Sequence, residues 1–304
     1  MSGARPPTGR GAWGNPEGGP NLKSGQPCQQ GMLDLSRFTG TAQFGPAYKV
    51  MLEHYPCPSW TIDQGLARMM VRVCDETADC LYREFTPTYT TYRKGARPEL
   101  EHALKSAIGD LRAPEEIVRA VAGFTRDLNP PQSTNTEDIV FGGTEEEIIA
   151  RKSEFCGEHA RVACALLQVA GVPSRIVILA DTTKAYSGHV MVEAFRGGKW
   201  GAVDSSSCVP YMKEDGEPAT TWELICQPEL IEKHFREGVT LFSARGQFRA
   251  AAISNYPLGE VTRYCYETAR VNYYYRAILA MSDRGWPGGI RWLFGEDREE
   301  ALPP

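Results

Sequence analysis

The stretch SEFCGEHARVACALLQVAGVPSRIVIL, residues 153–179, decides the fold, and two shorter stretches follow it: SGHVMVEAF at 187–195 and GKWGAVDSSS at 198–207. The first has the pattern of a helix that leads into a strand, and the other two have the pattern of strands. Each stretch holds one reactive side chain, namely Cys156, His189 and Asp204 in chain order. Residues of these types can serve as a nucleophile, a base and an orienting acid.

Cys156 is predicted to lie at or just before the first turn of a helix. After it, small and apolar residues recur at helical spacing: Ala160, Ala163, Cys164, Leu167 and Ala170. Gly171 and Pro173 then end the helix. At a helix start the free N–H groups and the helix dipole favour a thiolate, and the same amides can hold an oxyanion. A lone cysteine is more often a small buried residue, so the interpretation depends on its two partners.

The two later stretches predict a hairpin, because Gly197-Gly198 separates two short apolar runs at 188–195 and 200–205. With the loop centred on these glycines, Asp204 faces Met191, and His189 lies one step further along on the same face. Side chains on that diagonal are about 7 Å apart at Cβ or less. A slip by one residue would separate the pair. The opposite face is then a core face made of Val190, Val192, Ala194, Gly201 and Val203. Taken singly, the histidine would more often be structural and the aspartate a turn residue.

These motifs together resemble the transglutaminase-like superfamily, within the wider papain-like cysteine enzymes. The resemblance covers about residues 113–210: the helix-start Cys156, AGVPSR before a strand, GHV on the next strand and W-x-x-V-D on the one after. It implies a triad of Cys156, His189 and Asp204 in an α+β fold, with an active-site helix packed on an antiparallel sheet and further helices before and after this core. Glu154 stands where many members have glycine.

The implied chemistry is covalent acyl transfer. His189 takes the proton of Cys156 or holds it as an imidazolium, Asp204 fixes the ring, and the thiolate attacks an amide or ester carbonyl. Water then gives hydrolysis and an amine gives transamidation. The N–H of Cys156 is the expected oxyanion donor, with Gln132 or Asn135 as a guess for the second. His159 is one turn further along and is expected to be a polar contact or a group on the substrate side.

Composition sets limits on the partners. The chain has 304 residues, 42% hydrophobic and 23% charged, with a formal net charge of −5. No dense basic stripe is present, which argues against nucleic acid and anionic membranes as general partners and favours a peptide-like or small-molecule amide substrate. The sequence contains no run of about 18 apolar residues and no apolar signal core near its start, so we expect a soluble cytoplasmic protein.

No cofactor and no metal are expected. Animal transglutaminases resemble this chain only in the core and need calcium, but the sequence has no calcium loop of alternating Asp or Asn ligands with a closing Glu. Nine scattered cysteines lack the CxxC spacing of a zinc site and the density of a disulfide scaffold, so the chain is expected to fold without either. His54 and Cys57 could begin a metal site, but no second ligand pair at matching spacing follows.

The chain divides into four predicted parts: a disordered Gly/Pro-rich tail at 1–31, a mainly helical part at 32–112, the catalytic core at 113–215 and a helical part at 216–304 packed on the core. Helices are predicted at 63–85, 98–109, 113–128, 221–236 and 260–281. The residues at 129–144 are predicted to form a loop that could wall the cleft, and Asn255 and Tyr256 could reach the cleft from another loop.

Two other classes of function stay open at this point. One is a binding module that kept the fold without catalysis, although such descendants typically lose one of the three residues and this chain has all three. The other is a metalloprotein built on scattered His and Cys residues.

Overall fold

The computed structural model describes the chain in several segments: residues 34–39, 70–84, 92–131, 142–180, 188–236, 248, 250–256 and 258. The elements in chain order are η1 (Leu35–Phe38), β1 (Val71–Val73), α3 (Asp75–Ala78), the π-helical η3 (Asp79–Glu84), α4 (Pro98–Ile108), α5 (Pro114–Arg126), α6 (Glu145–Arg151), α7 (Cys156–Val169), β2 (Ser174–Ala180), β3 (Gly188–Arg196), β4 (Lys199–Asp204), β5 (Val209–Pro210), α8 (Thr221–Cys226), α9 (Glu229–Arg236) and β6 (Ala250–Asn255).

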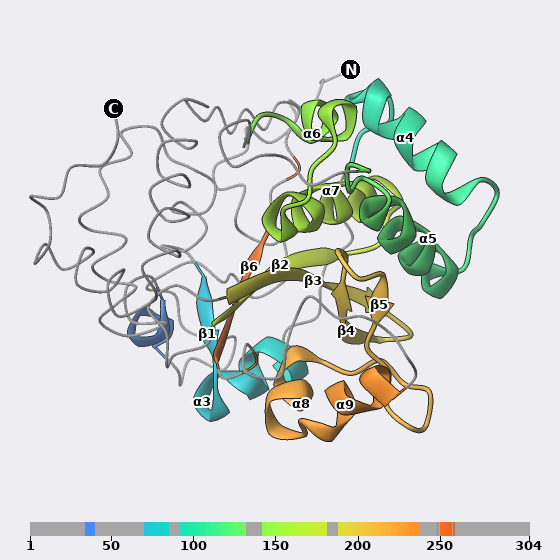
Figure 1. Ribbon diagram of the computed structural model, residues 1–304. Coiled ribbons are helices and arrows are strands. Elements are labelled where there is room, and N and C mark those ends of the chain that lie inside the picture. The colour runs from blue at the N-terminus through green and yellow to red at the C-terminus, as the bar shows by residue number, and fades with distance from the viewer. Residues whose placement is uncertain are drawn as a thin grey trace, which may run out of the picture.

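An antiparallel sheet forms the centre of the described structure, with six strands in the order β1-β6-β2-β3-β4-β5. Helices α4, α5, α6 and α7 lie on one face of the sheet, and α3, α8 and α9 lie on the other (Figure 1). The molecule is therefore an α+β fold with helices on both sides of one sheet, in agreement with the predicted fold class.

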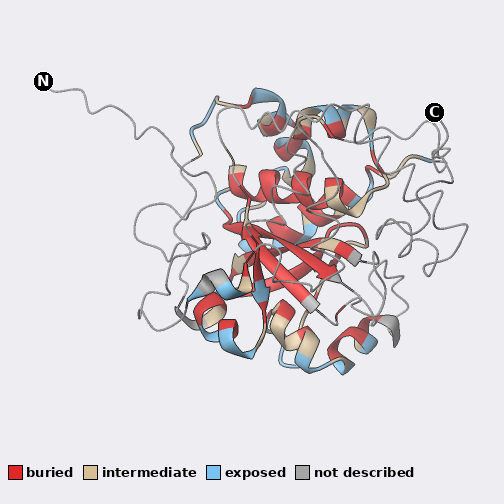
Figure 2. Cartoon of the chain, turned by 90° about the vertical axis from the view of Figure 1, so that its left-hand side faces the viewer, coloured by how far each residue is buried: buried red, intermediate tan, exposed pale blue. Residues whose placement is uncertain are grey.

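Helix α7 packs directly against the sheet and is covered on its outer side by the neighbouring helices. Every residue from Glu158 to Gln168 is buried, as expected for a helix enclosed on all sides. Its apolar side chains share a core cluster with Ile176, Val192 and Val203 of the central strands. Figure 2 shows the buried residues running through the sheet and the helix above it. The start of α7 is thus held rigidly relative to the strands.

The opposite face of the sheet is equally apolar. Val177, Met191 and Ala202 pack there against Leu81 and Leu224 from the second layer of helices. A buried ion pair crosses the same face: the Arg175 guanidinium lies 2.6 Å from Glu193, and both side chains are fully buried. The guanidinium also stacks 3.9 Å from the Trp200 ring. Since both faces are covered, alternate residues of β3 are buried on opposite sides.

The hairpin has the predicted form. Strands β3 and β4 pair with Val192 opposite Val203 and Arg196 opposite Lys199. Gly197 and Gly198 both have positive φ, at 59° and 79°, which is the backbone that a two-residue type I′ turn requires and that glycine adopts without strain.

Helices predicted at 98–109 and 113–128 are confirmed as α4 and α5, and the helix at Cys156 is confirmed as α7. The predicted helix at 63–85 is wrong at Val71–Val73, which is a strand paired with β6, but Asp75–Glu84 is helical, as α3 and η3. The predicted helix at 221–236 is two helices, since Pro228 lacks an N–H and interrupts the first. The tail at 1–31, His54, Cys57 and the helix at 260–281 lie outside the described residues, as does most of the loop at 129–144.

Two features of the structure were not predicted from the sequence, namely a strand in the last part of the chain and a disulfide-bonded cysteine. Residues 250–255 form β6, which fills the place between β1 and β2 in the sheet. Cys80 is disulfide-bonded, so the expectation of a fold without disulfides is wrong. The free thiols among the described residues are Cys74, Cys156, Cys164, Cys208 and Cys226. Within the described segments, no helix has the length and apolarity needed to cross a membrane.

Candidate functional site

Cys156 is the first residue of α7. Phe155 caps the helix in extended backbone conformation, and its carbonyl accepts from the N–H groups of Glu158 and His159. In the described structure, nothing accepts a hydrogen bond from the N–H of Cys156 or Gly157, as is usual for the first turn of a helix without a side-chain cap. Cys156 is half-buried, so a reactant can approach its sulfur while these two donors point out of the helix end.

His189 and Asp204 come together through the hairpin register. Because Val192 pairs with Val203, Asp204 lies opposite Met191, and the side chains of His189 and Asp204 point to the same side. Nε2 of His189 lies 3.1 Å from Oδ2 of Asp204. This distance is that of an ion pair, but the geometry at Nε2 does not meet the criteria for a hydrogen bond. Catalytic contacts in the absence of substrate are often loose in this way.

The carboxylate of Asp204 is held by the turn that follows β4. Its Oδ1 accepts from the backbone N–H groups of Ser206 and Ser207, both at 3.0 Å. The hydroxyl of Thr125, near the end of α5, donates to the carbonyl of Ser205 at 3.0 Å. One carboxylate oxygen is thereby fixed by the backbone, and the other is left to face the histidine.

Cys156 completes the group from the neighbouring helix. Its side chain lies close enough to His189 for its negative charge to raise the pKa of the ring, and because Nε2 faces Asp204, Nδ1 is the ring atom left for the sulfur. Met191 and Ala202 point to the same face of the sheet as His189 and Asp204, and they pack in the apolar cluster on the face away from α7. The three side chains therefore meet at the ends of the strands, beyond the last β3–β4 pair, rather than under the body of the helix.

Electrostatics favour a charged imidazole. Burial alone would lower the pKa of His189, but the negative charges of Asp204 and Cys156 beside it raise the pKa to about 10. Opposite charges beside a buried histidine stabilise its protonated form. The arrangement is therefore suited to an imidazolium that faces a thiolate on one side and a carboxylate on the other.

His159, the other histidine near the cysteine, is fully buried. Its Nε2 lies 2.6 Å from the carbonyl oxygen of Ser153, and its Nδ1 lies 3.0 Å from Oγ of Ser206. Burial lowers the pKa of this ring. Both ring nitrogens are engaged inside the protein. Of the two roles expected for His159, the structure therefore agrees with the polar contact and not with a group on the substrate side.

The remaining predicted site residues fall elsewhere. Gln132 and Asn135 lie outside the described residues. Tyr256 is buried away from solvent, where its hydroxyl donates to Glu145 and accepts from Nε of Arg161, so the expectation that it reaches the cleft from a loop is wrong. Asn255 belongs to β6. Among the described residues, no cluster of His, Cys, Asp and Glu could hold a metal ion.

Three residues that orient the site were missed from the sequence. The serines after Asp204 carry a local signal, because an Asp followed by short polar residues commonly accepts from the N–H groups two and three positions on. Thr125 carries no such signal: its bond to Ser205 joins residues 80 positions apart and depends on how α5 packs.

A comparison with protein-family models finds a match to the transglutaminase-like superfamily over residues 101–205. The match begins inside α4 and ends just after β4. Searches of curated proteins and of solved structures found no match. Residues 101–205, which contain Cys156, His189 and Asp204, therefore resemble the transglutaminase-like superfamily.

Proposed function

We propose that the protein is a cysteine-dependent acyl-transfer enzyme, with Cys156 as nucleophile, His189 as acid and base, and Asp204 as the group that orients His189. The observation that carries the proposal is the meeting of the three side chains: His189 contacts Asp204 at 3.1 Å and lies beside Cys156, whose negative charge raises the pKa of the histidine. The superfamily as a whole consists mainly of cysteine-based acyltransferases and proteases.

In the first half-reaction the Cys156 thiolate attacks the carbonyl carbon of an amide or ester. A C–S bond forms, and the π electrons of the carbonyl move to its oxygen. When the tetrahedral adduct collapses, the bond to the leaving group breaks, and His189 gives its proton to the departing amine or alcohol. The products are a thioester on Cys156 and a neutral His189.

In the second half-reaction His189 takes a proton from water or from an amine as that molecule attacks the thioester. Collapse of the second adduct breaks the C–S bond and returns Cys156 as a thiolate beside the imidazolium. Asp204 keeps its charge throughout and stabilises the protonated ring. Water as acceptor gives hydrolysis, and an amine gives transamidation.

The oxyanion of both adducts is expected to bind the N–H of Cys156. This group has no acceptor in the described structure and sits at the positive end of the α7 dipole, where negative charge is stabilised. The N–H of Gly157 is available beside it. A backbone donor of this kind is already in place before the charge develops.

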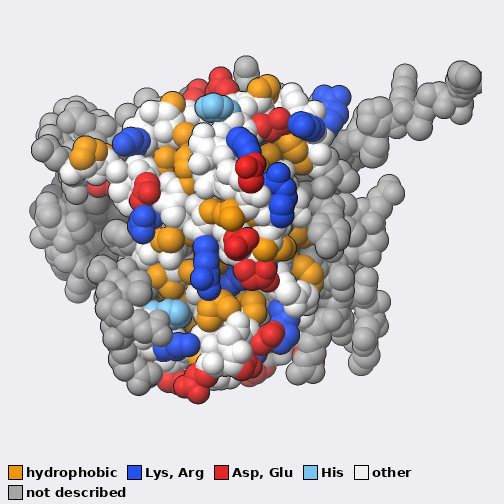
Figure 3. Space-filling view, turned by 90° about the vertical axis from the view of Figure 1, so that its right-hand side faces the viewer, with side chains coloured by type: hydrophobic (Ala, Val, Ile, Leu, Met, Phe, Trp, Pro, Cys, Tyr) orange, Lys and Arg blue, Asp and Glu red, His pale blue; other side chains and the backbone are white. Residues whose placement is uncertain are grey.

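We propose a peptide-like or small-molecule amide as the substrate. On the face shown in Figure 3, Lys and Arg side chains alternate with Asp and Glu, and no broad field of one sign appears. A polyanion such as nucleic acid would require a concentrated positive field. A small neutral amide needs only access to Cys156.

The proposal is tested by incubating the protein with a panel of amides and esters and searching for an acyl group on the peptide that contains Cys156 by mass spectrometry. The expected result is a thioester on Cys156 that decays to acid, or to a new amide when an amine is added. Cys156→Ala should abolish both, while Cys226→Ala, at an exposed free thiol, should leave them unchanged. Turnover in the Cys156→Ala protein would contradict the proposal.

A further inference from the structure

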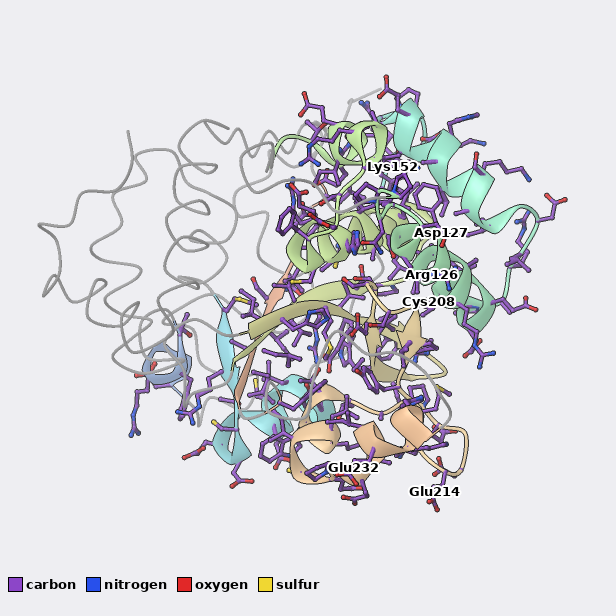
Figure 4. All side chains as sticks on the ribbon, in the orientation of Figure 1. Arg126, Asp127, Lys152, Cys208, Glu214 and Glu232 are labelled. Carbon is purple, nitrogen blue, oxygen red and sulfur yellow. The ribbon has the colours of Figure 1, made fainter. Side chains whose placement is uncertain are left out.

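The reactive cysteine and the orienting acid each adjoin a loop, and the two loops are separated by about fifty residues in the sequence. Residues 152–155 lead into Cys156, and residues 205–208 follow Asp204. Lys152 and Cys208, at the outer ends of these loops, lie on the same side of the molecule in Figure 4, with Arg126 and Asp127 at the end of α5 between them. Both ends have unusual backbone, since Lys152 and Cys208 are the non-glycine residues with positive φ within the described segments, at 64° and 58°.

His159 contacts both loops from inside the protein. Its Nε2 is 2.6 Å from the Ser153 carbonyl, which can only accept, so Nε2 carries the hydrogen. Its Nδ1 then has a lone pair, which accepts the hydroxyl hydrogen of Ser206 at 3.0 Å. The hydrogen-bond chain fixes the neutral tautomer of this ring.

One contact continues to the residue before Cys156, and the other continues to Asp204. On one side, Oγ of Ser153 accepts from the N–H of Phe155 at 3.2 Å, and Phe155 is the cap that precedes Cys156. On the other side, the N–H of Ser206 donates to Oδ1 of Asp204 at 3.0 Å. The His159 ring is therefore linked through Ser153 to Phe155, the residue before Cys156, and through Ser206 to the Asp204 carboxylate.

We propose that His159 is a positioning residue, which ties the loop before Cys156 to the turn after Asp204 and so sets the distance between the nucleophile and the acid. The inference rests on the proposed function, since it assigns the residue that aligns the same triad. Burial supports it: His159 is fully buried and Ser206 is 3% exposed, so water cannot easily replace either hydrogen bond, and loss of one leaves its partner unsatisfied.

The two contacts can be separated by substitution. The amide of His159→Gln reaches about as far as Nε2 and can still donate to Ser153, while His159→Asn reaches about as far as Nδ1 and can still bond Ser206. Ser206→Ala removes the second contact and leaves the ring in place. Ser206→Ala removes only one hydroxyl group and is the smallest of the three changes. It can therefore still be measured if a His159 variant does not fold.

The test measures the alkylation rate of Cys156 by iodoacetamide against pH in the three variants and the wild type, with the exposed thiol of Cys226 as the reference in the same sample. Urea unfolding gives the stability of each variant. We expect all three to lose about 5- to 10-fold of the Cys156 rate at about pH 6, because a looser triad stabilises the thiolate less. The Cys226 rate should not change.

A lower unfolding midpoint with an unchanged pH profile of Cys156 alkylation would show a merely structural role and would overturn the inference. Failure of the proposed function looks different: in that case wild-type Cys156 would itself react no faster than Cys226 at this pH, and the alignment inference would fall with it.

Discussion

Nε2 of His189 lies 3.1 Å from Oδ2 of Asp204, and neither side chain is more than 4% exposed. A carboxylate held this close in a buried site raises the pKa of the imidazole and selects the orientation in which Nδ1 faces the sulfur. The relationship has consequences for reactivity and for stability, and both can be measured.

Asp204→Asn should lower the alkylation rate of Cys156 at about pH 6 by about 10- to 100-fold, because the neutral amide no longer stabilises the imidazolium that accompanies the thiolate. The measurement is the rate of iodoacetamide incorporation at Cys156, followed by mass spectrometry. Asp110→Asn changes a charge at an exposed position and serves as the matched control, with no expected effect. An equal rate in Asp204→Asn and wild type would exclude the orienting role of Asp204.

Folding stability should depend on pH through His189. The pKa of this group rises from 6.5 to about 10 on folding, so its contribution is fully present below pH 6.5 and is lost as the pH rises through about 10. Urea unfolding across this range should show the difference between wild type and His189→Gln shrinking toward high pH. His102→Gln, at an exposed surface position, is the control. A difference that is constant with pH would contradict the shifted pKa.

The buried ion pair under the sheet gives a test of stability. Arg175→Met leaves the Glu193 carboxylate in the core without its counter-ion, and we expect a loss of about 3–5 kcal/mol in the free energy of unfolding. Glu193 also accepts from the Tyr82 hydroxyl and the Thr221 N–H. Glu193→Gln keeps an acceptor for these groups, so the double variant should regain more than half of the loss. If the double variant is no more stable than Arg175→Met, the unpaired charge is not the cause.

Two glycines should respond oppositely to alanine. A Cβ at Gly201 would lie 2.5 Å from Cβ of Pro218 and 2.9 Å from the Arg196 guanidinium, so Gly201→Ala should cost about 1–3 kcal/mol in the free energy of unfolding. A Cβ at Gly123, inside α5, meets the Cys208 sulfur at 3.8 Å, so Gly123→Ala should stabilise by up to about 1 kcal/mol. Equal effects in urea unfolding would show that the contact at Pro218 is relieved.

The parts of the fold that follow local rules could be predicted from the sequence. The start of α7, its end at Gly171 and the hairpin around Gly197 and Gly198 all have short-range signals, and the parity of a hairpin then places His189 and Asp204 on one side. The register was predictable because a two-residue loop leaves little freedom.

The parts that depend on distant partners could not be predicted. Val71–Val73 lies in a stretch with helical spacing of its apolar residues, and it is a strand because β6 offers an unpaired edge. The run at 250–255 is short and rich in alanine, a residue that is depleted in strands. The contacts of His159 also depend on tertiary packing, since Ser206 is 47 positions away.

The central claim is that Cys156 is an activated nucleophile, and competitive alkylation tests it most directly. Folded protein is treated briefly with substoichiometric iodoacetamide at about pH 6, and labelling is quantified at the free thiols of the described chain, Cys74, Cys156, Cys164, Cys208 and Cys226. The account predicts that half-buried Cys156 is labelled first, ahead of exposed Cys226, and that His189→Gln removes this preference. Labelling in order of exposure, with Cys226 ahead of Cys156, would contradict the account.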